Sequence, residues 1–105
     1  MKYVLLICGD ETTTETGCGG WSDEMAERGV LVQAGVGLRP PSDATTVRVR
    51  DEAVMLSDGP FAETKEQIGG FCVIECADLD EAIEITAKHP MAACGAIEIR
   101  PLWQP

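Results

Sequence analysis

The segment most suited to chemistry is 58–61 (DGPF), a tight acidic turn that ends in a phenyl ring. Lys65 and Glu66 follow closely, so charged side chains and an aromatic ring are expected at one corner, where a strand begins. A carboxylate beside an aromatic wall has a raised pKa and can act as an acid or a base. Asp58 is therefore a candidate catalytic residue, and Asp58, Phe61 and Lys65 are candidate ligand-binding residues.

A purely structural interpretation of the same segment stays open, because Asp-Gly-Pro is also common turn chemistry. In that interpretation the Asp58 carboxylate accepts hydrogen bonds from the N–H groups of Gly59, Phe61 and Ala62, since proline offers none. Phe61 then folds back as a buried anchor that holds the turn against the body or against a partner chain.

Two further residues have suitable chemistry. Arg48 shares one face of an alternating strand with Arg50, where it is either a candidate ligand-binding residue for an anion or part of a solvated face. His89 is the single histidine and stands at the expected end of a helix, where the helix dipole favours its cation. It is a candidate catalytic residue, or a helix-terminal histidine with no catalytic task.

The cysteines argue against a metal centre. There are five, none in a C-x-x-C pair, and Cys72 and Cys76 on one strand would be roughly 13 Å apart. With one histidine besides, no metal and no cofactor are expected. Thiols within apolar runs behave as small hydrophobic groups, which favours a reducing compartment and therefore a cytoplasmic location.

These candidates require a framework, which the hydropathy pattern supplies. The most apolar runs, 2–8 and 69–76, are expected to be strands buried on both faces. The remaining strands are expected at 30–38, 45–50, 53–56 and 96–103, and the helices from Trp21 to Arg28 and from the cap residue Asp78 to Pro90, which ends the second helix.

This order predicts an α+β fold, a ferredoxin-like split βαβ unit with an inserted β-hairpin between its second and third core strands. The topology places 2–8 and 69–76 at the centre of the sheet, in agreement with their apolar character. Two helices cover only one face of such a sheet, yet strand 2–8 is apolar on both. A second copy of the sheet is the simplest cover, so we expect a homodimer packed face to face.

Composition limits the classes of function. The 105 residues are 45% apolar and 25% charged, which is typical of one soluble globular domain over 1–105. The longest apolar run, 3–8, is too short to cross a membrane, and a net charge of −10 repels phosphate backbones. No membrane and no direct nucleic-acid contact are expected. Residues 51–105 hold 11 acidic and 3 basic side chains, either a solubilising surface or a docking face for a basic protein.

The segment 58–78 (DGPFAETKEQIGGFCVIECAD) resembles the defining stretch of the DGPF-motif branch of the YCII-related proteins. The similarity extends over nearly the whole chain, from KYVLLICGDE at the start to IEIRPLW at the end. It implies a dimeric α+β barrel and a molecular function that is largely undefined. The simpler YCII branch has an active dyad with a histidine in the first helix region, but residues 12–28 contain no histidine. That dyad therefore has no counterpart here.

Two functions follow as hypotheses. The first is a small-molecule binder or enzyme, with a pocket between the sheet and its partner and the Asp58–Lys65 corner at the rim. The resemblance suggests the second, since members of the DGPF branch are often encoded beside extracytoplasmic-function sigma factors. In that case the chain is an accessory protein that contacts a sigma factor through its acidic half. Whether a reaction is catalysed stays open, because no complete catalytic set is visible.

Overall fold

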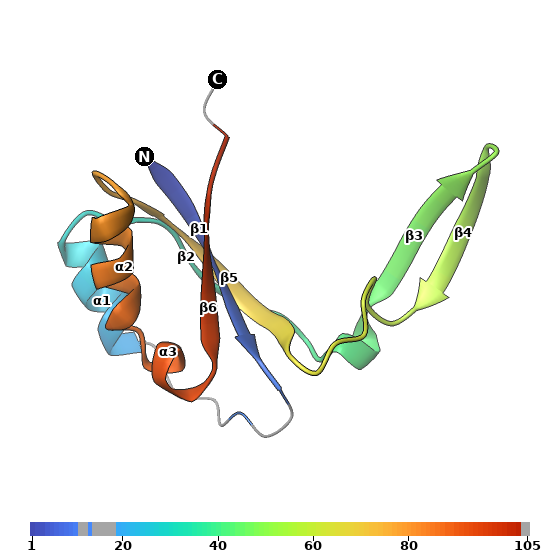
Figure 1. Ribbon diagram of the computed structural model, residues 1–105, viewed down its shortest axis with the longest axis horizontal. Coiled ribbons are helices and arrows are strands. Elements are labelled where there is room, and N and C mark those ends of the chain that lie inside the picture. The colour runs from blue at the N-terminus through green and yellow to red at the C-terminus, as the bar shows by residue number, and fades with distance from the viewer. Residues whose placement is uncertain (11–12, 14–18, 104–105) are drawn as a thin grey trace.

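The structure is a computed structural model of the chain and describes residues 1–10, 13 and 19–103. Its main body is a four-stranded antiparallel sheet in the order β2-β5-β1-β6. The strands are β1 (Lys2–Gly9), β2 (Leu31–Gly37), β5 (Gln67–Glu75) and β6 (Ala96–Pro101). The expected ferredoxin-like α+β fold is confirmed, with the two most apolar strands, β1 and β5, at the centre of the sheet (Figure 1).

Two helices, α1 (Gly19–Glu27) and α2 (Leu79–Ala87), lie against one face of this sheet (Figure 1). Alternate residues of the central strands point toward them, because successive side chains of a strand face opposite ways. The core on this side consists of apolar side chains from both layers: Tyr3, Leu5, Cys72 and Ile74 from the strands, and Trp21, Met25, Ala82 and Ile85 from the helices.

The other face of the sheet carries no helix. Val4 pairs with Val73 and Leu6 pairs with Phe71 across β1 and β5, so these four side chains share that face. All four are only partly buried. We call this the open face; its apolar residues are those that the sequence expects a second copy to cover.

The second helix begins as predicted, since Asp78 Oδ1 accepts a hydrogen bond from the Glu81 N–H at 2.9 Å. The helix α2 ends at Ala87, before Pro90, in agreement with the prediction. Pro90 is also the first residue of a short third helix, α3 (Pro90–Cys94), which the sequence did not predict. Proline is well tolerated at that position, because its missing N–H would have no partner in the first turn.

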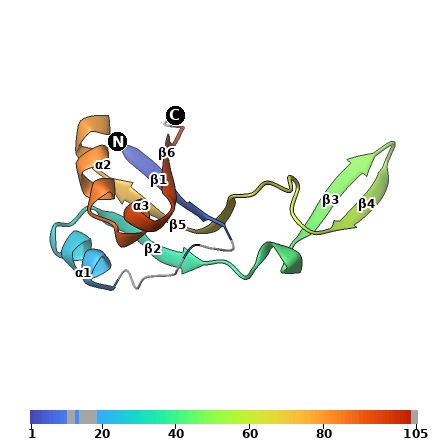
Figure 2. The same cartoon turned by 60° about the horizontal axis from the view of Figure 1, so that its bottom comes forward.

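The inserted hairpin forms a separate two-stranded sheet of β3 (Thr45–Arg50) and β4 (Ala53–Asp58), preceded by the 3₁₀ turn η1 (Pro41–Asp43). Figure 2 shows it projecting from the body as an arm. The Cα radius of gyration is 15.7 Å, against roughly 13 Å for a compact chain of this length. Residues Thr45–Asp58 are called the arm below.

None of the helices in the described part of the chain is long and apolar enough to cross a membrane.

Candidate ligand site

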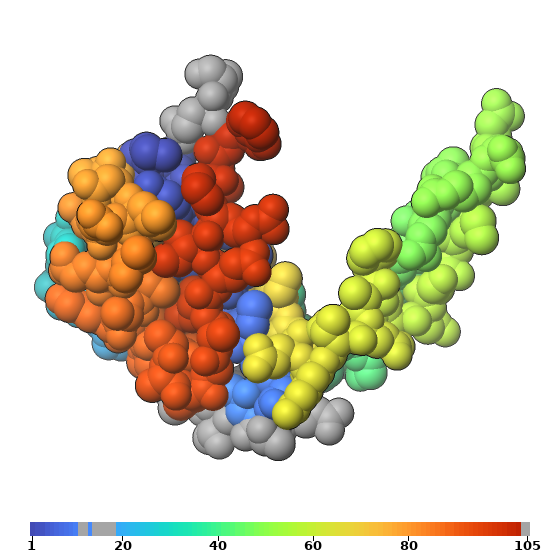
Figure 3. Space-filling model, in the orientation of Figure 1, coloured from blue at the N-terminus to red at the C-terminus, as the bar shows by residue number. Residues whose placement is uncertain are grey.

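A cavity of about 770 Å³ lies where the central strands of the sheet end and the connections to the arm begin. Segments far apart in the sequence meet in its wall, among them the end of β1, the start of β5, the connections 38–42 and 59–65, and the start of α3. Figure 3 shows the wide hollow that separates the arm from the body. A space of this size is typical of small-molecule sites.

His89 is the most constrained polar residue of this cavity. Its side chain lines the wall, and the residue is only 3% exposed. Its Nδ1 accepts a hydrogen bond from the Met91 N–H at 3.0 Å and caps α3. Because Nδ1 is the acceptor, the proton of the neutral ring lies on Nε2.

The expected protonation of His89 is therefore wrong. Burial lowers the pKa of this imidazole below its ordinary value of 6.5, so the ring is neutral at pH 7. The sequence indicated the C-terminal end of a helix, where a cation is favoured. In the structure His89 is also the N-cap of the next helix, at the positive end of that helix's dipole.

Asp10 is a second polar residue of the cavity, and sequence reasoning missed it. Its carboxylate is largely buried and accepts a hydrogen bond from Thr13 Oγ1 at 3.3 Å, while its N–H donates to the same oxygen at 2.9 Å. Lys65 Nζ lies 4.0 Å from Asp10 Oδ2. The available signal was its position, since Asp10 is the first charged residue after the apolar strand 2–8.

The rest of the cavity wall consists largely of apolar side chains and of backbone atoms at glycine residues. Ile7, Ile68 and Met91 contribute side chains, and Gly70 brings β5 close to β2. A Cβ atom on Gly70 would lie 2.8 Å from the carbonyl oxygen of Val36, which is too close for any side chain without a backbone shift. The glycine therefore permits the narrow strand spacing that forms this part of the cavity.

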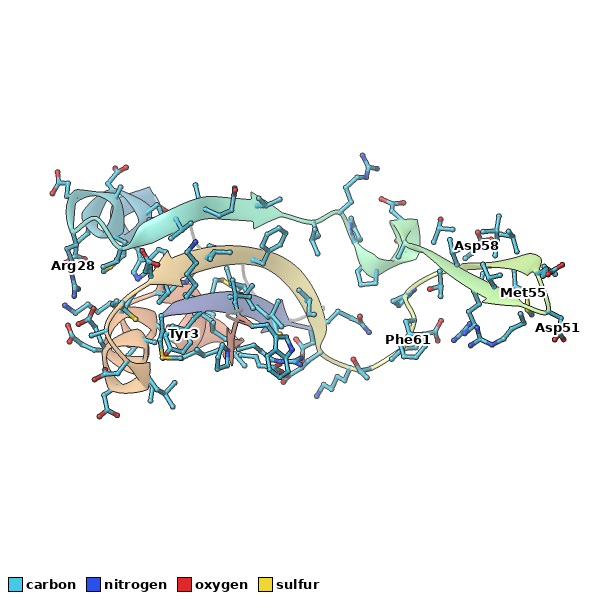
Figure 4. All side chains as sticks on the ribbon, turned by 90° about the horizontal axis from the view of Figure 1, so that it is seen from above. Tyr3, Arg28, Asp51, Met55, Asp58 and Phe61 are labelled. Carbon is cyan, nitrogen blue, oxygen red and sulfur yellow. The ribbon has the colours of Figure 1, made fainter. Side chains whose placement is uncertain are left out.

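The structure separates the residues of the DGPF segment (58–61) into two places. Gly59 and Pro60 line the cavity, as does Lys65, whereas Asp58 and Phe61 do not. Figure 4 shows Asp58 and Phe61 at the arm, far from Tyr3 in the body. Of the candidate residues, Lys65 and His89 thus share one cavity, and Asp58 is in a different place.

The expected cap by Asp58 is absent. In the part of the chain that the structure describes, its carboxylate makes no hydrogen bond to Gly59, Phe61 or Ala62, and its side chain is exposed. The turn is held instead by the Gly59 N–H, which donates to the Ala44 carbonyl at 2.7 Å, and by Thr46 Oγ1, which donates to the Gly59 carbonyl at 2.9 Å. The positive φ of 98° at Gly59 turns the chain away from Asp58.

Phe61 is not buried against the body of its own chain, being 78% exposed. Its ring lies under the guanidinium of Arg48, whose Cζ is 5.1 Å from the ring centroid. Two candidate ligand residues are thus brought together, in a cation–π contact on the arm. They stand beside a shallower hollow of about 510 Å³ that Phe61 lines together with Leu38, Glu66 and Glu98.

Other reactive chemistry has little support in the described residues. No group of three or more His, Cys, Asp or Glu side chains among them is arranged to hold a metal ion. Cys8 lines the cavity, but burial raises the pKa of its thiol, and the neighbouring carboxylates of Glu98 and Glu66 raise it further. A thiol in this environment stays protonated and is a poor nucleophile.

Comparison with known proteins places these features in a family. The model of the YCII-related domain matches residues 1–104. An uncharacterized protein of Rhizobium meliloti (strain 1021) is 37% identical over an alignment 118 positions long, which covers 97% of this chain and 92% of the relative. Family model and relative both span nearly the whole length, and the chain belongs to the family of YCII-related domains.

Proposed function

We propose that this chain is a small-molecule-binding protein whose ligand occupies the cavity at His89. The observation that carries the proposal is the Nε2 atom of His89. The residue is almost completely buried and lines the cavity, yet no residue that the structure describes accepts a hydrogen bond from Nε2. Among the described residues, the fully buried side-chain polar atom that lacks a partner is Thr86 Oγ1, so His89 Nε2 is still accessible to solvent. A ligand atom that accepts a hydrogen bond from Nε2 can replace the water there.

The chemistry of the wall describes the ligand. A neutral imidazole N–H suits a neutral acceptor such as a carbonyl oxygen, and the side chains of Ile7, Ile68 and Met91 suit an apolar body. Asp10 and Lys65 offer an acceptor and a donor near the mouth. Among the residues that the structure describes, the site has constrained polar side chains, His89 and Asp10, but no activated nucleophile, which supports binding more strongly than catalysis.

The proposal includes a homodimer in the cytoplasm. A second copy is suited to cover the open face, because Val4, Leu6, Phe71 and Val73 form an apolar surface with no helix over it. Cys8, Cys76 and Cys94 carry free thiols, which is what a reducing compartment maintains.

The test uses acetophenone, a neutral aryl ketone, as the probe. Cumene is the control ligand, because it has a similar apolar body but no oxygen that could accept a hydrogen bond. Methyl signals of Ile7, Ile68 and Met91 should shift in NMR spectra on addition of the ketone, and more weakly with cumene. Gly35 offers the blocking variant, since it lines the cavity and a Cβ there meets nothing within 4 Å, so that a leucine side chain has room to fill part of it. Gly35→Leu should abolish the shifts and His89→Phe should weaken them. Equal shifts in both variants would exclude this cavity as the site.

A second proposal follows from the acidic surface. Asp80 and Glu84 are exposed on α2, beside the many other carboxylates of residues 51–105. If the chain is of the DGPF branch, a basic face of an extracytoplasmic-function sigma factor is the partner to test. Binding that weakens steeply with added salt and is lost in an Asp80→Asn, Glu84→Gln variant would favour this function.

A further inference from the structure

The arm exposes an apolar face that nothing in its own chain covers. Val47 pairs with Leu56 and Val49 pairs with Val54, so these four side chains share one side of the hairpin. Each is more than half exposed. The two strands of the arm contact chiefly each other, and an isolated two-stranded hairpin is marginally stable in water. The arm therefore requires a surface to pack on.

The arm does not pack on the open face of its own sheet. The Gly59 N–H donates to the Ala44 carbonyl at 2.7 Å and closes the base of the hairpin, while the Leu38 N–H donates to the Gly69 carbonyl at 2.9 Å in the connection to the body. Figures 1 and 2 show the arm pointing away from the sheet. One chain thus holds two apolar surfaces that do not pack on each other.

We propose that the arm of each copy packs the side formed by Val47, Val49, Val54 and Leu56 on the open face of a second copy. The exchange is reciprocal, so a two-fold axis covers both arms and both open faces with the same contact made twice. This inference rests on the dimer of the proposed function and adds which part of the chain makes it.

The area fits this occupant. From strand spacing and rise, the four strands of the body present roughly 400 Å² of open face and the two strands of the arm roughly 200 Å², so the arm fits on part of the open face. Made twice, the contact covers roughly 400 Å² per partner before the relief of the side chains is included, about half of the roughly 800 Å² per partner of a standard interface.

The charge distribution also favours a second copy. Two chains of −10 repel each other, and the repulsion is smallest where the approaching part carries little charge. The arm holds two arginines and three carboxylates, so it contributes only −1 of that total. With so little net charge, the arm can approach another acidic copy without strong repulsion.

The experiment compares two substitutions on opposite sides of the same hairpin. Leu56→Asp places a carboxylate on the apolar side, whereas Met55→Asp places one on the other side, opposite Arg48. Both positions are about equally open in the single chain, so neither should disturb the protomer. By light scattering and sedimentation, the parent chain and Met55→Asp should be dimers of the same affinity. Leu56→Asp should raise the dimer dissociation constant by roughly a hundredfold or more, because two unpaired carboxylates would be buried.

A complementation test identifies the surface that receives the arm. Val73→Asp damages the open face and should also give monomers. A mixture of Leu56→Asp and Val73→Asp chains should form more dimer than either variant alone, because one of its two contacts joins an intact arm to an intact open face and both carboxylates fall in the other. Circular dichroism checks that each variant is folded; if Val73→Asp is not, Val4→Asp, its partner across β1, replaces it.

The possible failures are distinguishable. A Leu56→Asp chain that dimerises like the parent, or a mixture that stays monomeric, overturns the exchange and leaves a dimer of another kind. A parent chain that is monomeric overturns the exchange together with the proposed dimer. Binding of acetophenone in the cavity is measured in a separate experiment. Its result decides the ligand proposal whether the chain is a monomer or a dimer.

Discussion

The indole ring of Trp21 meets the imidazole ring of His89 edge to face, with the two centroids 4.7 Å apart. Trp21 Nε1 also donates to the Ile85 carbonyl at 2.9 Å, a buried bond between helices distant in sequence. The aromatic contact and the hydrogen bond join α1, α2 and the start of α3. They hold the imidazole of His89 in place in the wall of the cavity.

Loss of the Trp21 bond should weaken the whole body of the protein. Trp21→Phe keeps an aromatic ring but removes the donor, and should lower the free energy of unfolding by about 1–2 kcal/mol. Chemical denaturation followed by circular dichroism measures it. Trp103→Phe is the matched control, because Trp103 is 99% exposed and should change nothing. Equal losses in both variants would contradict the structural role of the Trp21 contact.

The buried imidazole should make stability depend on pH. Because the pKa of His89 is lowered in the folded state, the unfolded chain binds a proton first as pH falls through 6.5. The free energy of unfolding should therefore be fully retained above that pH and decline below it, by at most about 1.4 kcal/mol per pH unit. His89→Asn keeps a capping side chain and should lose this dependence between pH 7.5 and 5.5. A parent chain whose stability is constant over that range would show that the histidine is not desolvated.

The exposed position of Phe61 changes the expected cost of its removal. A buried phenylalanine would cost about 3 kcal/mol on truncation to alanine, but a cation–π contact at an exposed site contributes about 0.5–1 kcal/mol. Phe61→Ala should therefore destabilise the protomer by no more than that, and Asp58→Ala, which removes no hydrogen bond in the described structure, by less. Thermal melts at concentrations where the chain is monomeric check both. A loss near 3 kcal/mol for Phe61→Ala would restore its role as a buried anchor.

Two glycines in the cavity wall offer a direct comparison. Gly70→Ala forces a methyl group against the Val36 carbonyl, which should separate β2 from β5 and cost about 1–3 kcal/mol. Gly35→Ala meets nothing within 4 Å and should stay within about 0.5 kcal/mol of the parent. Denaturant midpoints with unchanged slopes provide the measurement. If Gly35→Ala were the more harmful change, the spacing of β2 and β5 would differ from the one described.

The sequence by itself determined the strands, the two longer helices and the centre of the sheet. Strands 2–8 and 69–76 are apolar on successive positions, and only the central places of a two-layer fold can bury so much of both faces. The cap at Asp78 was equally readable, since a side chain and an N–H three residues on need no distant partner. These features depend on residues that are close in the sequence, so the local sequence pattern is enough to predict them.

Only the tertiary structure decided where the chemistry lies. His89 stands beside a proline in a sequence that fits either a helix end or a helix start, and Trp21 from another helix is what buries it. Asp10 and Lys65 lie close together in one cavity, whereas Asp58 and Phe61 lie outside it, at the arm. Burial and proximity are set by segments far apart in the chain, so the alternating pattern of residues 45–56 predicts a hairpin but not the direction in which it points.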